Sequence, residues 1–177
     1  MSEIALKICI FGDGGVGKTT LVRRYITGAF EEDLKMSIGV DITIKRIEVN
    51  GFNVMLQIWD FAGEYDFRHL LPNYAAGAHG GIIAYDISRM ATLTHIGEWL
   101  DTFRQTTSGS EFKIPILLLG CKSDLELSRS VSNDNVIEAV HNHNLDGDIE
   151  CSAKIGSNVE DVFSKIAVLA IKSHKFL

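Results

Sequence analysis

The sequence has few cysteines and no excess of positive charge, and each shortage excludes a class of protein. Three cysteines in 177 residues, Cys9, Cys121 and Cys151, are too few and too irregularly spaced for a disulfide framework or a Cys-x-x-Cys zinc site. We therefore expect free thiols in a reducing compartment. The net charge is -6, from 17 basic and 23 acidic residues, and the sequence contains no basic stripe that could bind along a nucleic-acid backbone. No nucleic-acid partner is predicted.

Long apolar runs and targeting signals are also missing. No run reaches the length of a transmembrane segment, and the first residues, MSEIALKICIF, carry an acid where a signal peptide has positive charge. The last residues, KSHKFL, contain no cysteine for prenylation, so the chain shows no lipidation motif. These absences predict a soluble cytoplasmic protein that reaches membranes only peripherally, through partners. The length predicts a single domain over residues 1–177, and we expect a monomer.

Short apolar runs alternate with longer amphipathic stretches, which predicts an α/β domain. Strands are expected over residues 6–11, 41–49, 53–60, 81–85, 114–119 and 148–151. Helices are expected over residues 18–26, 92–106, 132–143 and 159–172, the last with Asn158 as its N-cap. Asn50-Gly51 tolerates positive φ at both positions, so it favours a hairpin and one antiparallel strand in an otherwise parallel sheet.

The stretch FGDGGVGKTT, residues 11–20, fits two phosphate-binding patterns. One is the G-x-G-x-x-G of dinucleotide sites, and the other is the G-x-x-x-x-G-K-[ST] of triphosphate sites. Acids at residues 31–33, about twenty residues on, would suit the ribose of a dinucleotide, but a hairpin follows them instead of a βαβ unit. Lys18 supplies an ammonium for the β- and γ-phosphates, and Thr19 supplies a hydroxyl for Mg²⁺. The context favours a triphosphate over a dinucleotide or a purely structural turn.

Two more motifs follow expected strands at the same edge of the sheet. Asp60 can hold Mg²⁺, and Gly63 lets the backbone approach the terminal phosphate. Asp124 offers two acceptor oxygens for the N1–H and N2–H₂ donors of guanine, whereas adenine presents an acceptor there. Either motif alone would be an ordinary turn. In combination with the phosphate-binding stretch they predict a guanine nucleotide.

The segments FGDGGVGKTTL, SIGVDI, LQIWDFAGE, YAAGAHG, YDIS, GCKSDL and CSAK resemble, in order and spacing, the Ras superfamily of small GTPases, and most of all its Rab branch. The resemblance spans nearly the whole chain. It implies a P-loop NTPase three-layer sandwich, in which a six-stranded mixed sheet with one antiparallel strand carries helices on both faces. It also implies a switch that binds GTP and GDP with Mg²⁺ and hydrolyses GTP. A second hypothesis is a GTP-binding scaffold with little or no hydrolysis.

The resemblance assigns roles to individual residues. It implies that Lys18, Gly63 and Glu64 are the catalytic residues. It implies that Thr19, Ser37 and Asp60 bind Mg²⁺. Nucleotide binding falls to Gly14, Gly15, Val16, Gly17, Lys18, Thr19, Thr20, Phe30, Ser37, Gly63, Cys121, Lys122, Asp124, Leu125, Ser152, Ala153 and Lys154.

The resemblance also implies two switch segments, residues 32–41 and 60–74, through which effectors, activating proteins and exchange factors would bind. The aromatic triad of Rab proteins matches Ile42, Trp59 and Tyr74, so its first member is aliphatic here. Gly14 would leave room beside the γ-phosphate for an arginine from an activating protein.

Four positions depart from the family pattern: Ser37, Phe61, Glu64 and Cys121. Ionised Glu64 only accepts hydrogen bonds and brings negative charge toward the γ-phosphate, so we expect slow intrinsic hydrolysis. Two other interpretations stay open, in which Glu64 is a general base or turns into solvent. Cys121 replaces an amide by a weakly hydrogen-bonding thiol, which predicts weaker binding or faster exchange of nucleotide. Ser37 keeps a hydroxyl for Mg²⁺, and Phe61 is expected to pack inward.

Overall fold

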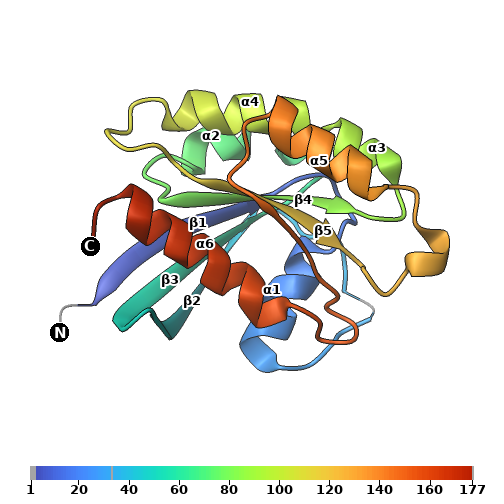
Figure 1. Ribbon diagram of the computed structural model, residues 1–177, viewed down its shortest axis with the longest axis horizontal. Helices are drawn as coiled ribbons and strands as arrows, with labels where there is room; N and C mark the ends of the chain where they lie inside the picture. Colours follow the sequence, from blue (N-terminus) through green and yellow to red (C-terminus); the bar gives the residue numbers. More distant parts are fainter. Residues whose placement is uncertain (1–2, 33, 177) are drawn as a thin grey trace.

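The computed structural model describes residues 3–32 and 34–176, which form a β-sheet between two layers of helices (Figure 1). Asp33, within the first predicted switch segment, lies outside the described residues, as do residues 1, 2 and 177.

The sheet has six strands in the order β2-β3-β1-β4-β5-β6. β2 pairs antiparallel with β3, and the other neighbouring strands are parallel. The predicted fold class is therefore confirmed. The bounds are β1 Ile4–Phe11, β2 Val40–Val49, β3 Phe52–Phe61, β4 Gly80–Asp86, β5 Ile116–Cys121 and β6 Asp148–Glu150.

The hairpin between β2 and β3 turns at Asn50 and Gly51, with φ of 51° and 81°. Both values lie in the left-handed region that the Asn-Gly pair tolerates, as predicted. β5 begins two residues later than expected because Pro115 lacks an N–H and cannot donate to the ladder.

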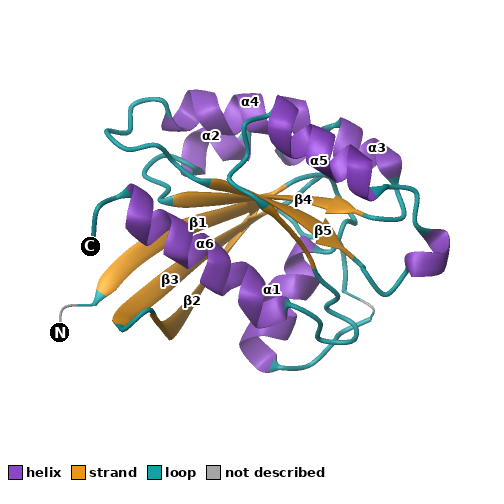
Figure 2. Cartoon of the chain, viewed as in Figure 1, coloured by secondary structure: helices purple, strands orange, loops and turns teal. Residues whose placement is uncertain are grey.

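Helices cover both faces of the sheet (Figure 2). α1 (Lys18–Thr27) and α6 (Val159–Ser173) cover one face, where Tyr25 stacks on Phe163 with ring centroids 4.1 Å apart. The other face carries α2 (Leu70–Tyr74), α3 (Met90–Thr94), α4 (Ile96–Thr107) and α5 (Asn133–Asn142). Two single 3₁₀ turns, η1 (Tyr65–Phe67) and η2 (Glu126–Ser128), complete the elements. Among the described residues, no helix has the length and apolar character of a membrane span.

Two helix predictions were wrong in detail. The helix expected over residues 92–106 is divided into α3 and α4 at His95, whose ring binds Asp13 at 2.6 Å. Asn158 does precede α6, but its side chain makes no cap bond. Instead its amide donates to the Glu150 carbonyl oxygen at 2.8 Å, which ties the start of α6 to β6.

The sheet topology places the site. β1 lies between β3 and β4, so the strands that follow it in the sequence extend the sheet on both of its sides, β2 and β3 on one and β4 to β6 on the other. In open α/β sheets this switch point opens a crevice outside the carboxyl ends of the strands. The segments that follow β1, β3, β5 and β6 all lie at that edge.

Candidate functional site

The phosphate loop, residues 12–20, runs from the end of β1 into the first turn of α1. Gly12, Gly15 and Gly17 have φ of 135°, 73° and 113°, which side-chain-bearing residues rarely adopt. α1 begins at Lys18 without a side-chain cap, so its first N–H groups point outward at the positive end of the helix dipole. The sequence folds here into an anion-binding turn.

A cavity of about 370 Å³ opens over this loop. It brings together most of the residues predicted to bind nucleotide, from the phosphate loop, residues 30 and 37, residues 63–64, and residues 121–125 and 153–154. Val16 and Ser152 do not line it, because both side chains are fully buried. Their predicted part in nucleotide binding would have to come from their backbone groups, or from their contacts with neighbouring residues that line the cavity.

Lys18 is a buried cation at the floor of the cavity. The residue is only 5% exposed, and its Nζ donates to the carbonyl oxygens of Gly12 and Asp13, both at 2.8 Å. Burial lowers the Lys18 pKa to about 8, against the opposing attraction of Asp60 and other acids. An anion in the cavity would compensate this buried charge.

Three oxygen-bearing side chains converge beside Lys18. The Thr19 hydroxyl donates to Asp60 Oδ2 at 2.5 Å and also contacts the Ser37 hydroxyl. The other oxygen, Asp60 Oδ1, is buried and makes no hydrogen bond among the described residues. Burial raises the Asp60 pKa to about 6, although the Thr19 hydrogen bond and Lys18 lower it. This oxygen set fits a hard cation such as Mg²⁺.

The segment after β3 lies directly on the phosphate loop. The Gly63 carbonyl oxygen accepts from the Gly14 N–H at 3.1 Å, and a Cβ at Gly63 would overlap the backbone of residues 12–14. A Cβ at Gly14 would lie 3.3 Å from Glu64 Oε1 and 3.6 Å from Met36 Cε. The room predicted beside Gly14 is thus lined by a carboxylate. Phe61 packs inward, 2% exposed.

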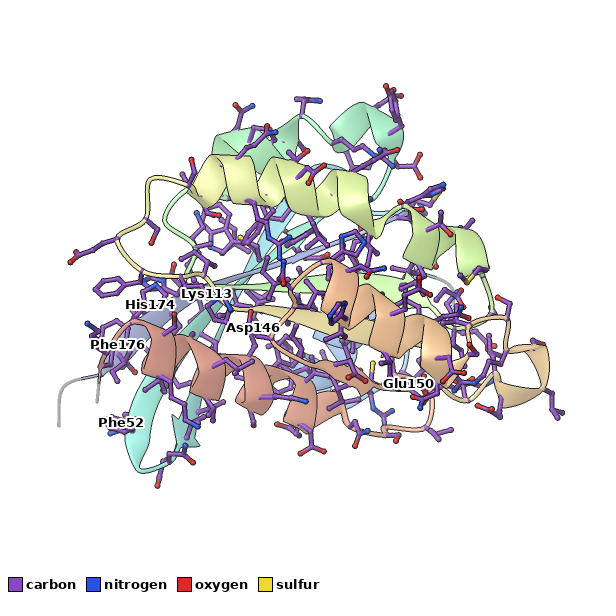
Figure 3. The ribbon with its side chains drawn as sticks, turned by 45° about the horizontal axis from the view of Figure 1, so that its top comes forward. Phe52, Lys113, Asp146, Glu150, His174 and Phe176 are labelled. Atoms are coloured by element: carbon purple, nitrogen blue, oxygen red, sulfur yellow. The ribbon has the colours of Figure 1, made fainter. Side chains whose placement is uncertain are left out.

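The base loops, residues 122–125 and 152–154, follow β5 and β6. Ser152 Oγ donates to Asp124 Oδ1 at 2.6 Å, so one loop orients the predicted guanine acceptor on the other. Arg129 holds Glu150 of β6 through two bonds of 2.8 Å. Figure 3 shows Glu150 well separated from His174 and Phe176, which lie on the other side of the view near the C-terminus.

Lys122 joins the base loops to the phosphate loop. Its backbone is left-handed, with φ 64°, and its Nζ donates to the Gly15 carbonyl oxygen at 2.8 Å and pairs with Asp86 Oδ2 at 2.8 Å. Burial of Asp86 is outweighed by hydrogen bonds from Lys122 and Ser88, which hold its pKa below the usual range. Asp86 was missed as a site residue, although its place at the carboxyl end of β4 was a usable signal.

Asp13 is the second residue that the sequence did not reveal. Its carboxylate accepts from Trp99 Nε1 at 2.9 Å, binds His95 Nδ1 at 2.6 Å and lies 3.5 Å from an Arg68 guanidinium nitrogen. Arg68 also pairs with Glu98 at 2.5 Å. The phosphate loop is thereby tied to the second switch segment and to α4. The contacts are tertiary, so no local pattern indicated them.

The predicted partner triad is contiguous. Ile42 pairs with Trp59 across β2 and β3, and the rings of Trp59 and Tyr74 lie 6.3 Å apart. Ile42 is 50% exposed and Tyr74 46%, beside Ile38 at 83%. An apolar surface therefore borders both predicted switch segments.

Comparisons with known proteins agree with this architecture. The family model described as "Ras family" matches residues 7–172. Ras-related protein Rab-19 of Xenopus laevis is 34% identical over 174 residues, which cover 98% of this chain and 80% of the relative. Ras-related protein Rab-1 of Theileria parva is 39% identical over 166 residues, covering 93% and 74%. Ras-related protein Rab-36 of Mus musculus is 40% identical over 172 residues, covering 94% and 62%.

Proposed function

The chain belongs to the Ras family as a Rab-like small GTPase, and we propose that it binds GTP and GDP with Mg²⁺ and hydrolyses GTP slowly without assistance. Family membership supports the general function, which is that of a GTP-binding switch in signalling or membrane traffic. Rab proteins associate with membranes, which is consistent with a peripheral attachment of this chain.

Lys18, Thr19 and Ser37 line one cavity, and Asp60 accepts a hydrogen bond from Thr19 beside it. This arrangement supports the Mg²⁺–triphosphate part of the proposal. Lys18 would meet the β- and γ-phosphates. Thr19 and Ser37 would coordinate Mg²⁺, with Asp60 holding the ion directly or through water. The cation would supply charge neutralisation of the phosphates, while the N–H groups of the phosphate loop orient them.

Guanine selection is assigned to the base loops. Asp124, oriented by Ser152, would accept from the two guanine donors, Phe30 and Lys122 would flank the base, and the Ala153 N–H would bind it. The same loops reach the phosphate loop through Lys122, so base and phosphate binding are mechanically connected.

Slow hydrolysis follows from the position of Glu64. Its carboxylate faces Gly14 and lines the cavity, so it adds negative charge where the γ-phosphate would lie. It also lacks the amide donor that would stabilise the charge of the transition state. This position supports the interpretation that Glu64 slows hydrolysis over the one in which its side chain turns into solvent. The interpretation of Glu64 as a general base stays open and can be tested.

Single-turnover GTP hydrolysis by the wild type and by Glu64→Gln tests the proposal. We expect Glu64→Gln to be at least about tenfold faster, equivalent to about 1.4 kcal/mol of the barrier. Asp66→Asn is the matched control, since it removes an exposed acid from the same segment and should leave the rate unchanged. A slower Glu64→Gln would indicate a general base, and an equal rate would show that Glu64 is uninvolved.

The scaffold alternative makes a different prediction in the same assay. Wild type and Glu64→Gln would both retain bound GTP over hours without producing GDP. Mass spectrometry of the nucleotide before and after the time course separates loss of binding from loss of hydrolysis.

A further inference from the structure

Cys121 and Cys151 lie next to each other where β5 and β6 end. The parallel register pairs Leu118 with Asp148 and continues to Gly120 with Glu150, so its next step brings the two cysteines opposite each other. The two segments stay hydrogen-bonded beyond β6, although the regular register ends at Gly120 and Glu150. The Cys151 N–H donates to the Gly120 carbonyl oxygen at 2.8 Å, and the Cys151 carbonyl oxygen accepts from the Ser123 N–H at 3.0 Å.

This arrangement places the Cα atoms of the two cysteines within the range that a disulfide spans. Neighbouring strands are about 4.8 Å apart, and residues opposite each other direct their side chains to the same face. A disulfide spans Cα separations of about 4.4–6.8 Å. Cys121 and Cys151 belong to the same buried cluster, and the neighbouring Cys121 thiol, together with burial, raises the Cys151 pKa above its usual range.

Both cysteines line the cavity that the proposed function assigns to nucleotide. Their residues are 3% and 1% exposed, so solvent and small oxidants reach them chiefly from that cavity. Bound nucleotide would cover this route. Cys9 differs from them: it is fully buried in β1, in the cluster on the other face of the sheet, and does not line the cavity.

We propose that Cys121 and Cys151 are a redox modification site, at which a peroxide forms a reversible disulfide and bound nucleotide shields the pair. Only the shielding rests on the proposed function; the disulfide itself rests on the pairing of the two residues. The empty site is then the oxidant-sensitive state of the protein.

Oxidation of the cysteine pair by peroxide takes two steps. The Cys121 thiolate attacks one peroxide oxygen and becomes a sulfenic acid, and the departing hydroxide takes up the thiol proton as water. The Cys151 sulfur then attacks the sulfenic sulfur, the S–S bond forms, and hydroxide leaves with the Cys151 proton as a second water. Two thiols are oxidised by two electrons and one peroxide is reduced. A small thiol reverses the bond by exchange.

The test uses the full reduced chain, either loaded with GDP and Mg²⁺ or emptied with EDTA and phosphatase, and exposed to hydrogen peroxide. Samples are quenched with an alkylating agent, and intact mass and peptide mapping follow the loss of two hydrogens. We expect one cross-linked peptide pair, containing Cys121 and Cys151, to form at least about tenfold faster in the empty protein. Dithiothreitol should restore the starting mass.

Three variants make the test specific. Cys121→Ser and Cys151→Ser should abolish the cross-link, whereas Cys9→Ser should keep it. Sulfinic acids without a cross-link, or a cross-link to Cys9, would overturn the proposal. Both outcomes are measured in the wild type, so they remain decisive even if a serine variant fails to fold. Equal rates in two samples whose nucleotide content is verified would overturn the shielding. Failure to load GDP would count against the proposed function alone, since the emptied sample still tests the disulfide.

Discussion

Replacing Asp60 by asparagine should stabilise the protein in the absence of nucleotide and Mg²⁺. Asp60 is 3% exposed, and one of its oxygens has no partner among the described residues. Burial raises its pKa from 3.8 to about 6, so its ionised form opposes folding. That rise corresponds to about 3 kcal/mol once the carboxylate is fully ionised. Asparagine has a similar shape and no charge, so it avoids this cost.

The sign of the pH dependence follows from the same pKa. Between about pH 4 and pH 6 the folded protein holds a proton on Asp60 that the unfolded chain has released, so stability falls as the pH rises. The advantage of Asp60→Asn should therefore grow from about 1.5 kcal/mol at pH 5 to about 3 kcal/mol at pH 7.5. With Mg²⁺ and GDP present, the order should reverse, because the cation then compensates the carboxylate.

Urea unfolding at the two pH values, with EDTA and without nucleotide, provides the measurement. Asp86→Asn is the matched control: it is also a buried acid, but hydrogen bonds lower its pKa, so its loss should destabilise the protein. A wild type as stable as Asp60→Asn at pH 7.5, or an unchanged difference between pH 5 and pH 7.5, would refute the reasoning.

Three further substitutions test separate parts of the site. Gly63→Ala should weaken GTP binding at least about tenfold, because a Cβ there overlaps the phosphate-loop backbone; Gly109→Ala, with open space around it, should leave GTP binding unchanged in the same titration. Cys121→Asn should slow nucleotide release by roughly five- to tenfold by adding an amide donor, and equal dissociation rates would defeat this. Arg129→Ala should cost about 1–2 kcal/mol in thermal unfolding, since it removes both bonds to Glu150, and an unchanged melting temperature would contradict it.

The sequence predicted the sheet and the location of the site because both depend on local patterns. Apolar runs marked each strand, and Asn50-Gly51 marked the antiparallel hairpin. The rule that ligands meet the carboxyl ends of strands then placed the phosphate loop, Asp60 and Asp124 at one edge.

Features that depend on contacts between distant segments could not be predicted. His95, where the predicted helix is divided, bonds to Asp13, which lies 82 positions away in the sequence. Lys122 was predicted to bind nucleotide, but its bond to the Gly15 carbonyl oxygen also links two loops 107 positions apart. Cys121 and Cys151 come close only because β5 and β6 are neighbouring parallel strands.

Guanine-specific binding is the central claim, and competition for a fluorescent guanine nucleotide in Mg²⁺ tests it most directly. GDP and GTP should displace the probe at concentrations near its own, because Asp124 accepts from donors that both share. ADP should fail to displace it at about a thousandfold excess, since adenine presents an acceptor where guanine presents donors and leaves the Asp124 carboxylate unpaired. Displacement by ADP at the same concentrations as GDP would contradict the account.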